Sequence, residues 1–465
     1  MSETGKESLK KTTGFLLIFL LTTYLLAGFA KKFNADEYQC MVVGAELAAG
    51  KKLYVDIWDN HGPLMSHVAG TIVHLSAVES HDIFYIARMF IFLCVGATVF
   101  FTIRLARQVG HPLSFFPEMC GIVLLLFSFF SQKAFEVRSD VPFMAIWAAS
   151  LWLWLHAFHS RDGGRPWKFL WSGIVLGTCF LFSLKTLFLG ATTGIVFCIA
   201  MILERRSMVR ETIYFGAGTA VVPLAMLFWF QETGTLDPFL LSFVLQNADR
   251  ESESAGLAFL DMMKSIPIST LCILTGILGP LVMKARKQNV PTSVLLLSVS
   301  TATLLFQYLF LLPTHHTQSL LPLSISGSIA FAWFILEKGR ELAPKMTFLA
   351  SVNAPRRWIA LLFVIVLTCS LQQRWFKFKA AGQLEEARAL LQEIEPESPV
   401  MDGYGIPLFR PRPMKYKSWI NTLRDRAKNG TLDMDISREM DRHDIRYVVW
   451  RSEEHTSELQ SRQSI

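Results

Sequence analysis

Residues 83–103 read IFYIARMFIFLCVGATVFFTI, an apolar run in which Arg88 is the only charged side chain. A helix needs roughly 17–25 mainly apolar residues to cross the hydrocarbon core of a bilayer, so this run is long enough to be a membrane span. Comparable runs recur along the chain. We predict eleven spans, near residues 14–30, 83–103, 113–131, 141–159, 167–183, 186–203, 211–230, 267–283, 291–312, 317–336 and 358–371.

The overall composition supports a membrane protein. Of 465 residues, 52% are hydrophobic and only 18% are charged, whereas soluble domains carry about 25% charged residues. The net charge of +7 is better explained by basic cytoplasmic loops than by a nucleic-acid partner. The seven cysteines contain no C-x-x-C motif, so neither a disulfide framework nor a zinc knuckle is expected.

Residues 64–78 are apolar but too short for a span. His67, Thr71 and His74 would share one polar face of a helix, and Leu64, Val68, Ile72 and Leu75 would form the opposite face. This pattern predicts an amphipathic helix in the membrane interface. Contact with solvent explains the face of His67, Thr71 and His74 more simply than metal binding does.

The distribution of Lys and Arg among the loops sets the orientation. One set of loops and ends carries about twice as many basic residues as the other (19 against 9). The N-terminus is therefore predicted to be cytoplasmic and the C-terminal tail extracytoplasmic, in a multi-pass plasma (inner) membrane protein. The bias would reverse if residues 64–78 were a further span.

The predicted outer loops hold nearly all the unusual polar residues. They are residues 31–66, 132–140, 184–185, 231–266 and 313–316, and the residues of interest are Asp36, Glu37, Asp59, Asn60, His61, Arg138, Asp140, Lys185, Asn247, Arg250, His315 and His316. This asymmetry favours a site at the outer face over a channel, because a transporter is expected to keep ionisable residues near the midplane. Arg88 can snorkel outward or join the site. Gly216 and Gly218 are best explained by close helix packing.

The acidic pair Asp36-Glu37 after the first span, and the segment Asp59-Asn60-His61-Gly62-Pro63 before a short helix, resemble the C-type glycosyltransferase superfamily. The nearest branches are similar to dolichyl-phosphate-mannose protein mannosyltransferases and lipid A aminoarabinose transferases. The resemblance covers about residues 14–336. It departs from the family pattern where His61 and Gly62 replace a lysine and a proline.

The resemblance implies transfer of a sugar from a polyprenyl-phosphate carrier to an acceptor hydroxyl of a glycan, lipid or protein outside the cytoplasm. A carboxylate must accept the acceptor proton, and fixed cations must stabilise the departing phosphate. We therefore expect Asp36, Glu37 and Asp140 to be catalytic, and Lys185, Arg138, Arg250 and His61 to bind the donor phosphate. Asp59, Asn60 and Asn247 would shape the acceptor site, and His315 and His316 are candidate ligands of a divalent metal. No other cofactor is expected.

The expected fold is an all-α polytopic membrane bundle of about eleven spans plus an interfacial helix, with a small, truncated extracytoplasmic α/β domain. Its expected parts are residues 1–13, the cytoplasmic N-terminus; 14–372, the transmembrane core; and 373–450, the soluble tail. In the tail we predict helices at 383–394 and 418–429 and a strand at Ile445–Trp450. Residues 451–465 resemble a translated sequencing adapter and are set aside.

Two other classes of protein fit the same sequence features. One is a transporter or flippase for lipid-linked glycans, and the other is a non-catalytic membrane scaffold that carries the tail. The sugar, the acceptor, the metal dependence, the oligomeric state and the native C-terminus remain open.

Overall fold

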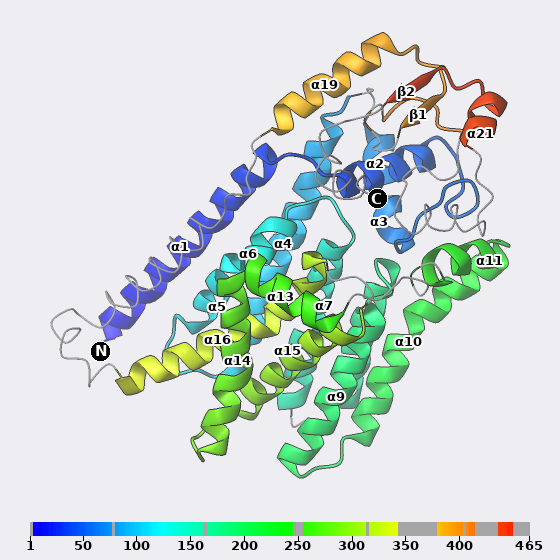
Figure 1. Cartoon of the computed structure of the whole chain (residues 1–465). Coiled ribbons are helices and arrows are strands. Elements are labelled where there is room, and N and C mark those ends of the chain that lie inside the picture. Colours follow the sequence, from blue (N-terminus) through cyan, green and yellow to red (C-terminus); the bar gives the residue numbers. More distant parts are fainter. Residues whose placement is uncertain are drawn as a thin grey trace. The chain divides into compact units, whose positions relative to one another are not determined.

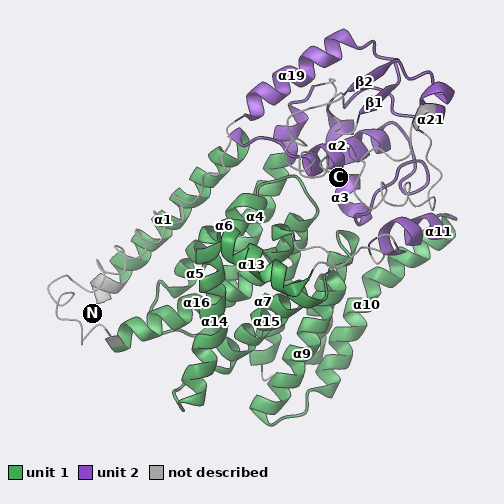
Figure 2. Cartoon of the chain, in the orientation of Figure 1, with its two compact units in different colours: residues 1–29, 88–233, 251–377 green, residues 30–87, 234–250, 378–465 purple. Residues whose placement is uncertain are grey.

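A computed structural model describes residues 3–76, 80–160, 165–245, 247, 254–312, 316–342, 379–402, 406, 408–413 and 436–449. The chain divides into two compact units (Figure 2). Unit 1 comprises residues 1–29, 88–233 and 251–377, and unit 2 comprises residues 30–87, 234–250 and 378–465.

Unit 1 is a bundle of helices (Figure 1). Its described elements are α1 (Glu3–Ala30), most of α4 (Ile83–Val109), α5 (Phe116–Leu126), α6 (Ser128–Lys133), α7 (Asp140–His159), α8 (Arg165–Thr178), η1 (Cys179–Leu181), α9 (Thr186–Glu204), α10 (Val209–Glu232), α13 (Ala255–Ser265), α14 (Pro267–Ala285), α15 (Thr292–Phe310), η3 (Thr317–Leu320) and α16 (Leu321–Leu342).

The chain is a multi-pass membrane protein, because eight of its described helices are long and apolar enough to cross a bilayer. They cover residues 7–30, 83–109, 140–159, 186–204, 209–232, 267–285, 292–310 and 317–341. Each coincides with a predicted span. The predicted span at 358–371 lies outside the described residues, so the count of eleven stays a prediction.

The predicted span at 113–131 is interrupted. Phe127 has an extended backbone (φ −60°, ψ 120°) that separates α5 from α6. Ser269 of α14 compensates for the break, since its hydroxyl oxygen lies 2.9 Å from the backbone nitrogen of Ser128 and 2.8 Å from the Ser128 hydroxyl. Such interruptions persist in membrane proteins where other groups satisfy the freed backbone.

The predicted span at 167–183 consists of the 14-residue helix α8 and the 3₁₀ turn η1. Helix α8 packs closely on α10 through glycines. A Cβ added at Gly173 would lie 2.1 Å from the carbonyl oxygen of Phe215, and one added at Gly218 would lie 2.2 Å from that of Leu170. Gly216 faces open space. The packing role predicted for the glycine pair therefore holds for Gly218 and not for Gly216.

Unit 2 contains α2 (Ala35–Ala48), α3 (Pro63–Leu75), α11 (Leu236–Phe239), the π-helical η2 (Leu240–Leu245), α19 (Ala380–Glu393), β1 (Val400–Asp402), α21 (Ile436–Arg442) and β2 (Tyr447–Val449). The two strands pair in parallel, with Val400 opposite Tyr447. The tail is tied to the segments around α2, since the side-chain amide of Gln383 bonds both the backbone nitrogen and the carbonyl of Phe33 at 2.7 and 3.1 Å. The helix predicted at 418–429 lies outside the described residues.

Helix α3 confirms a short helix after residue 62, and its position in the membrane interface stays a prediction. Leu75 is 76% exposed. The buried face includes the small residues Ser66, Ala69 and Gly70, and it comes so close to α2 that a Cβ added at Gly44 would lie 2.6 Å from the Cβ of Ala69. Close approach of the two backbones, rather than a row of large apolar side chains, therefore sets the orientation of α3.

Candidate functional site

Three predicted site residues of unit 1, Arg138, Asp140 and Lys185, form a charged group with Lys133 and Glu136, which we call the cationic cluster. Nη1 of Arg138 lies 2.7 Å from Oε2 of Glu136, and Nζ of Lys185 lies 2.7 Å from Oδ1 of Asp140. Arg138 also approaches Asp140 at 3.6 Å, and Lys133 approaches Glu136 at 3.4 Å. Residues 45 apart in the sequence are thus brought together, as predicted for Asp140 and Lys185.

The fold explains why these side chains meet. The break at Phe127 is followed by the short α6, which leaves residues 134–139 as a turn before Asp140 begins α7. Lys185 immediately precedes α9 in the connection after α8. Glu136, Arg138 and Asp140 are buried, whereas the Lys185 side chain is 28% exposed. The cluster has one more cation than carboxylates, and its lysines are its more accessible members.

Arg88 does not snorkel, because its side chain is buried. It is 3% exposed, and its Nη1 donates to the carbonyl oxygens of Gly28 and Phe29 at 2.8 and 3.2 Å. A guanidinium at this place satisfies carbonyls at the C-terminal end of α1, which have no partner inside the helix. We assign Arg88 a structural role.

In unit 2, the acidic pair opens α2. Asn34 accepts a hydrogen bond from the backbone nitrogen of Glu37 at 3.0 Å, and the Glu37 carboxylate accepts one from the backbone nitrogen of Asn34 at 3.3 Å. This reciprocal arrangement is a capping box. Glu37 is fully buried, whereas Asp36 is partly exposed. Of the two residues predicted to be catalytic, Asp36 is therefore better placed to meet a substrate.

The segment before α3 presents a second group. Oδ1 of Asp59 accepts hydrogen bonds from the backbone nitrogen of His61 at 3.1 Å and lies 2.9 Å from its Nδ1, while Oδ2 accepts from the Ser66 hydroxyl at 2.7 Å. Asn247 donates to the carbonyl oxygen of Asn60 at 2.8 Å. Asn247 and Asp59 thus hold the segment in place.

The sequence Gly62-Pro63 explains why α3 begins there. Gly62 is the residue before the helix, and Pro63 occupies the first helical position, where its missing N–H costs nothing and its fixed φ suits a helix. The hydrogen bond from Ser66 to Asp59 could be predicted only from the helical register. That register places Ser66 one turn into α3, next to the segment before the helix.

Three carboxylates of unit 2 act on the same thiol. Burial raises the pKa of Cys40 well above its usual value, and the charges of Asp59, Glu37 and Asp36 raise it further, in that order. The acidic end of α2 and the Asp59 segment are thus within electrostatic range of one another. Cys40 stays protonated near neutral pH and is a poor nucleophile.

Some predicted residues lie elsewhere or outside the described chain. Arg250 and His315 are not among the described residues, and His316 is an exposed residue at the start of η3. Within the described part of the chain, no group of three or more His, Cys, Asp or Glu side chains is arranged to hold a metal ion. The metal site stays a prediction.

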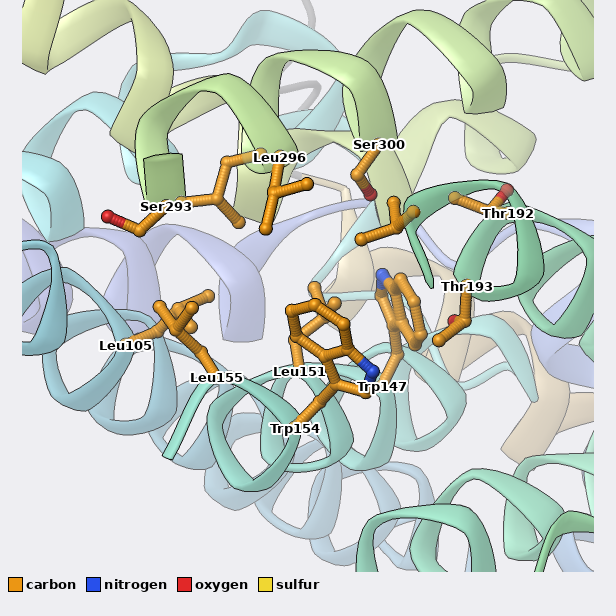
Figure 3. Close-up of a pocket in the computed structure, with 12 residues that line it drawn as sticks. Leu105, Trp147, Leu151, Trp154, Leu155, Thr192, Thr193, Ser293, Leu296 and Ser300 are labelled. Atoms are coloured by element: carbon orange, nitrogen blue, oxygen red, sulfur yellow. The ribbon is translucent and has the colours of Figure 1, made fainter. Parts of the chain in front are cut away.

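A cavity in unit 1 is not suited to a sugar. Its volume is about 20 Å³, and it is lined by α4, α7, α9 and α15. Trp147 and Trp154 of α7 and Ser300 of α15 lie around it (Figure 3). A single water needs about 10–15 Å³ by this measure, so the space takes little more than one water molecule.

Comparisons with known proteins bear on the fold. The sequence model of the family described as dolichyl-phosphate-mannose-protein mannosyltransferase matches residues 60–229. The crystal structure of ArnT from Cupriavidus metallidurans bound to undecaprenyl phosphate superposes with a TM-score of 0.62 and 14% identity, over 89% of this chain and 86% of that chain. The chain has the fold of a C-type glycosyltransferase. The resemblance predicted from the sequence is thus confirmed.

Other structures with the C-type glycosyltransferase fold agree. The apo form of ArnT from the same organism gives a TM-score of 0.60 at 15% identity, over 86% of each chain. The archaeal oligosaccharyltransferase AglB from Archaeoglobus fulgidus, in complex with an inhibitory peptide and a dolichol-phosphate, gives 0.51 at 9% identity, over 87% of this chain and 65% of that chain. No curated protein matches the chain by sequence.

Proposed function

We propose that the chain is a membrane glycosyltransferase that transfers a sugar from a polyprenyl-phosphate donor to an acceptor hydroxyl at the outer face of the membrane. The observation that carries the proposal is the shared fold over 89% of the chain with ArnT, which was crystallised with undecaprenyl phosphate. The match of the mannosyltransferase family model to residues 60–229 supports it. A flippase is not favoured by either finding.

The cationic cluster suits the phosphate of the donor. A phosphate oxygen can share the Lys185 ammonium with Asp140, because an ammonium has three donors and one of them serves the 2.7 Å contact with Asp140. Arg138, held between Glu136 and Asp140, contributes a fixed positive charge. In this proposal Asp140 orients the two cations, and Arg250 remains a further candidate.

Asp36 suits the role of general base. Its carboxylate belongs to the first turn of α2, whose start is fixed by the capping box, and it is accessible in part. A positioned base that takes the proton of the acceptor hydroxyl contributes about 100-fold to 10,000-fold to the rate. Asn60 and Asn247 then shape the acceptor site through the hydrogen bond between them.

The test is an assay of the purified protein with a panel of polyprenyl-phosphate sugars and candidate acceptors, measuring donor loss and free polyprenyl phosphate by mass spectrometry. Donor loss that requires an acceptor supports the proposal. Movement of the intact donor across liposome membranes with no bond made or broken would show a flippase instead. If no donor in the panel is consumed by a correctly folded sample, the proposed function is wrong.

A further inference from the structure

Two helices of unit 1 bring an arginine and two aromatic rings together. Trp167 of α8 and Tyr214 of α10 meet edge to face, with ring centroids 5.3 Å apart. The guanidinium carbon of Arg210, in the first turn of α10, lies 5.7 Å from the centroid of the Tyr214 ring. The close packing of α8 on α10 at Gly173 and Gly218 holds the two helices in place. We call Trp167, Arg210 and Tyr214 the α8–α10 patch.

The patch is open to its surroundings. Trp167 is 56% exposed, and Arg210 is exposed as well. Beside the patch on the same two helices, Trp171 is 61% exposed and Ile213 is 63% exposed. Because α10 is one of the helices that can cross the bilayer, this mixture of exposed apolar side chains and a cation fits the level of the lipid headgroups, where Trp and Tyr are enriched.

The residues around the patch carry an excess of positive charge. The segments 165–168 and 204–211 together contain five basic residues and two acidic ones. One of the two carboxylates, Glu211, is already shared between Arg206 at 3.0 Å and Arg165 at 3.6 Å. Within the part of the chain that the structure describes, the arginine of the patch has an aromatic contact and no ion pair. An anion can therefore bind this arginine without displacing a carboxylate.

The patch and the cationic cluster lie at opposite ends of α7. Asp140 of the cluster begins this helix. Arg165, two residues before Trp167, donates from Nη2 to the carbonyl oxygen of Phe158 in the last turn of α7, at 2.8 Å. At about 1.5 Å per residue, the 20 residues of α7 extend over about 30 Å, which matches the thickness of the hydrocarbon core of a bilayer. The patch is therefore separated from the cationic cluster by about one membrane thickness.

We propose that the α8–α10 patch binds one anionic phospholipid of the surrounding bilayer. The phosphate of the lipid bonds to the guanidinium of Arg210, whose donors match the geometry of a phosphate, and to the indole N–H of Trp167. The acyl chains of the lipid lie along Trp171 and Ile213. This inference does not depend on the proposed function, because it concerns a different part of unit 1.

The exposed surface fits a phospholipid better than a soluble anion. A soluble phosphate would neutralise Arg210 but would leave Trp171 and Ile213 uncovered, whereas a phospholipid covers the charged and the apolar side chains together. The headgroup must be anionic, because a zwitterionic headgroup brings its own cation into a region that already has an excess of positive charge. Each basic residue near a membrane surface raises the affinity for anionic lipid about fivefold.

Lipid binding to the purified full chain in detergent tests the proposal. Phosphatidylglycerol, phosphatidylcholine and undecaprenyl phosphate are added separately, and native mass spectrometry measures how many molecules of each bind and with what Kd. We expect one phosphatidylglycerol molecule to bind at least about tenfold more tightly than phosphatidylcholine. Equal affinity for these two lipids would overturn the proposal.

Arg210→Ala identifies the site. It should weaken the binding of phosphatidylglycerol about fivefold and leave the binding of phosphatidylcholine unchanged. Arg286→Ala is the matched control, because Arg286 is an exposed arginine that follows the last turn of another span, α14, and has no aromatic contact among the described residues. An equal loss of affinity in this control would show a general attraction to basic loops, and a specific site would be wrong.

The fluorescence of Trp167 gives a readout that does not depend on the stability of Arg210→Ala. In the wild type, phosphatidylglycerol with brominated acyl chains should quench tryptophan fluorescence more strongly than brominated phosphatidylcholine does. The difference should disappear in Trp167→Phe and persist in Trp229→Phe, since Trp229 is an exposed tryptophan in the last turn of α10. A difference that persists in Trp167→Phe would place the bound lipid elsewhere and contradict the proposal.

Undecaprenyl phosphate identifies the source of the phosphate. If it binds more tightly than phosphatidylglycerol and loses affinity in Arg210→Ala, the occupant of the patch is a polyprenyl carrier and the proposal is wrong. If its affinity is the same in the wild type and in Arg210→Ala, the proposal holds. A protein that binds phosphatidylglycerol at the patch but consumes no lipid-phosphate sugar refutes only the proposed function.

Discussion

In unit 1 charged side chains of the candidate site form ion pairs with one another, whereas in unit 2 two of its carboxylates also accept hydrogen bonds from the backbone. Arg138 and Lys185 meet Glu136 and Asp140 at 2.7 Å. Glu37 and Asp59, in contrast, accept hydrogen bonds from backbone nitrogens at 3.3 and 3.1 Å. Ion pairs can exchange partners when an anion arrives, whereas side chains held by the backbone keep one geometry. The ion pairs of unit 1 therefore suit the proposed binding of an anion, and the fixed carboxylates of unit 2 suit the proposed transfer of a proton.

The largest expected effect tests the chemical role of unit 2. Asp36→Asn should lower kcat by about 100-fold to 10,000-fold, because a general base is removed, while the unfolding temperature stays near that of the wild type. Glu37→Gln is the matched comparison, since glutamine also completes a capping box. Steady-state donor consumption gives both values. A larger loss of kcat in Glu37→Gln than in Asp36→Asn would reverse the assignment of the two carboxylates.

The binding role of unit 1 is tested at Lys185. Lys185→Ala removes a hydrogen bond to a charged group, which is worth about 1.5–3 kcal/mol, so the donor KM should rise about tenfold or more with a smaller change in kcat. Lys133→Ala removes a cation whose contact with Glu136 is longer, at 3.4 Å, and should have less effect. An equal rise in the donor KM of the two variants would indicate that the cluster attracts the phosphate through its overall charge rather than through a specific contact with Lys185.

The rigidity of the unit 1 scaffold depends on close helix packing. Gly218→Ala would place a Cβ 2.2 Å from the carbonyl oxygen of Leu170, and such overpacking costs about 1–3 kcal/mol. Gly216→Ala meets nothing within 4 Å and should be neutral. Thermal unfolding in detergent, followed by tryptophan fluorescence, compares the two. Equal unfolding temperatures would show that α8 and α10 can separate without cost.

The smallest expected effect is a pH dependence confined to unit 2. Burial lowers the pKa of His81 below its usual 6.5, and Arg388 and Arg412 lower it further, against the opposing hydrogen bond to the carbonyl oxygen of Ile406 and the charge of Asp82. The unfolded chain therefore binds more protons than the folded one, so stability falls as the pH drops below about 6.5.

Limited proteolysis of the tail measures this effect. We expect cleavage near residues 406–413 to be faster at about pH 5.5 than at pH 7.5. His81→Gln, which can still donate to Ile406 but does not titrate, should lose most of the difference. A pH dependence that persists in His81→Gln would place its origin in another group.

The sequence predicted the membrane bundle well because long apolar runs are a strong and local signal. All eight long apolar helices of the described chain coincide with predicted spans. The interruption at Phe127 could not be predicted, because residues 113–131 are uniformly apolar and the compensating hydroxyl comes from Ser269, far along the chain. The buried face of α3 was missed for a related reason, since glycine and alanine carry little hydrophobic signal but allow close backbone contact.

The candidate site was predicted in part. The sequence indicated that Arg138, Asp140 and Lys185 would lie near one another, because all three fall in loops predicted at the outer face of the membrane. It did not reveal that Glu37 completes a capping box, although Asn34 three residues earlier is a known signal for one. The contact between Asp59 and His61 was also missed. Only the turn between these two residues brings the carboxylate to the ring.

Helix α8 has a consequence for the choice of lipid. At about 1.5 Å per residue, its 14 residues extend over about 21 Å, less than the roughly 30 Å of hydrocarbon in an average bilayer. Such hydrophobic mismatch is relieved by local thinning of the bilayer. Acyl-chain length is therefore a variable to control when the protein is reconstituted for assays of its turnover.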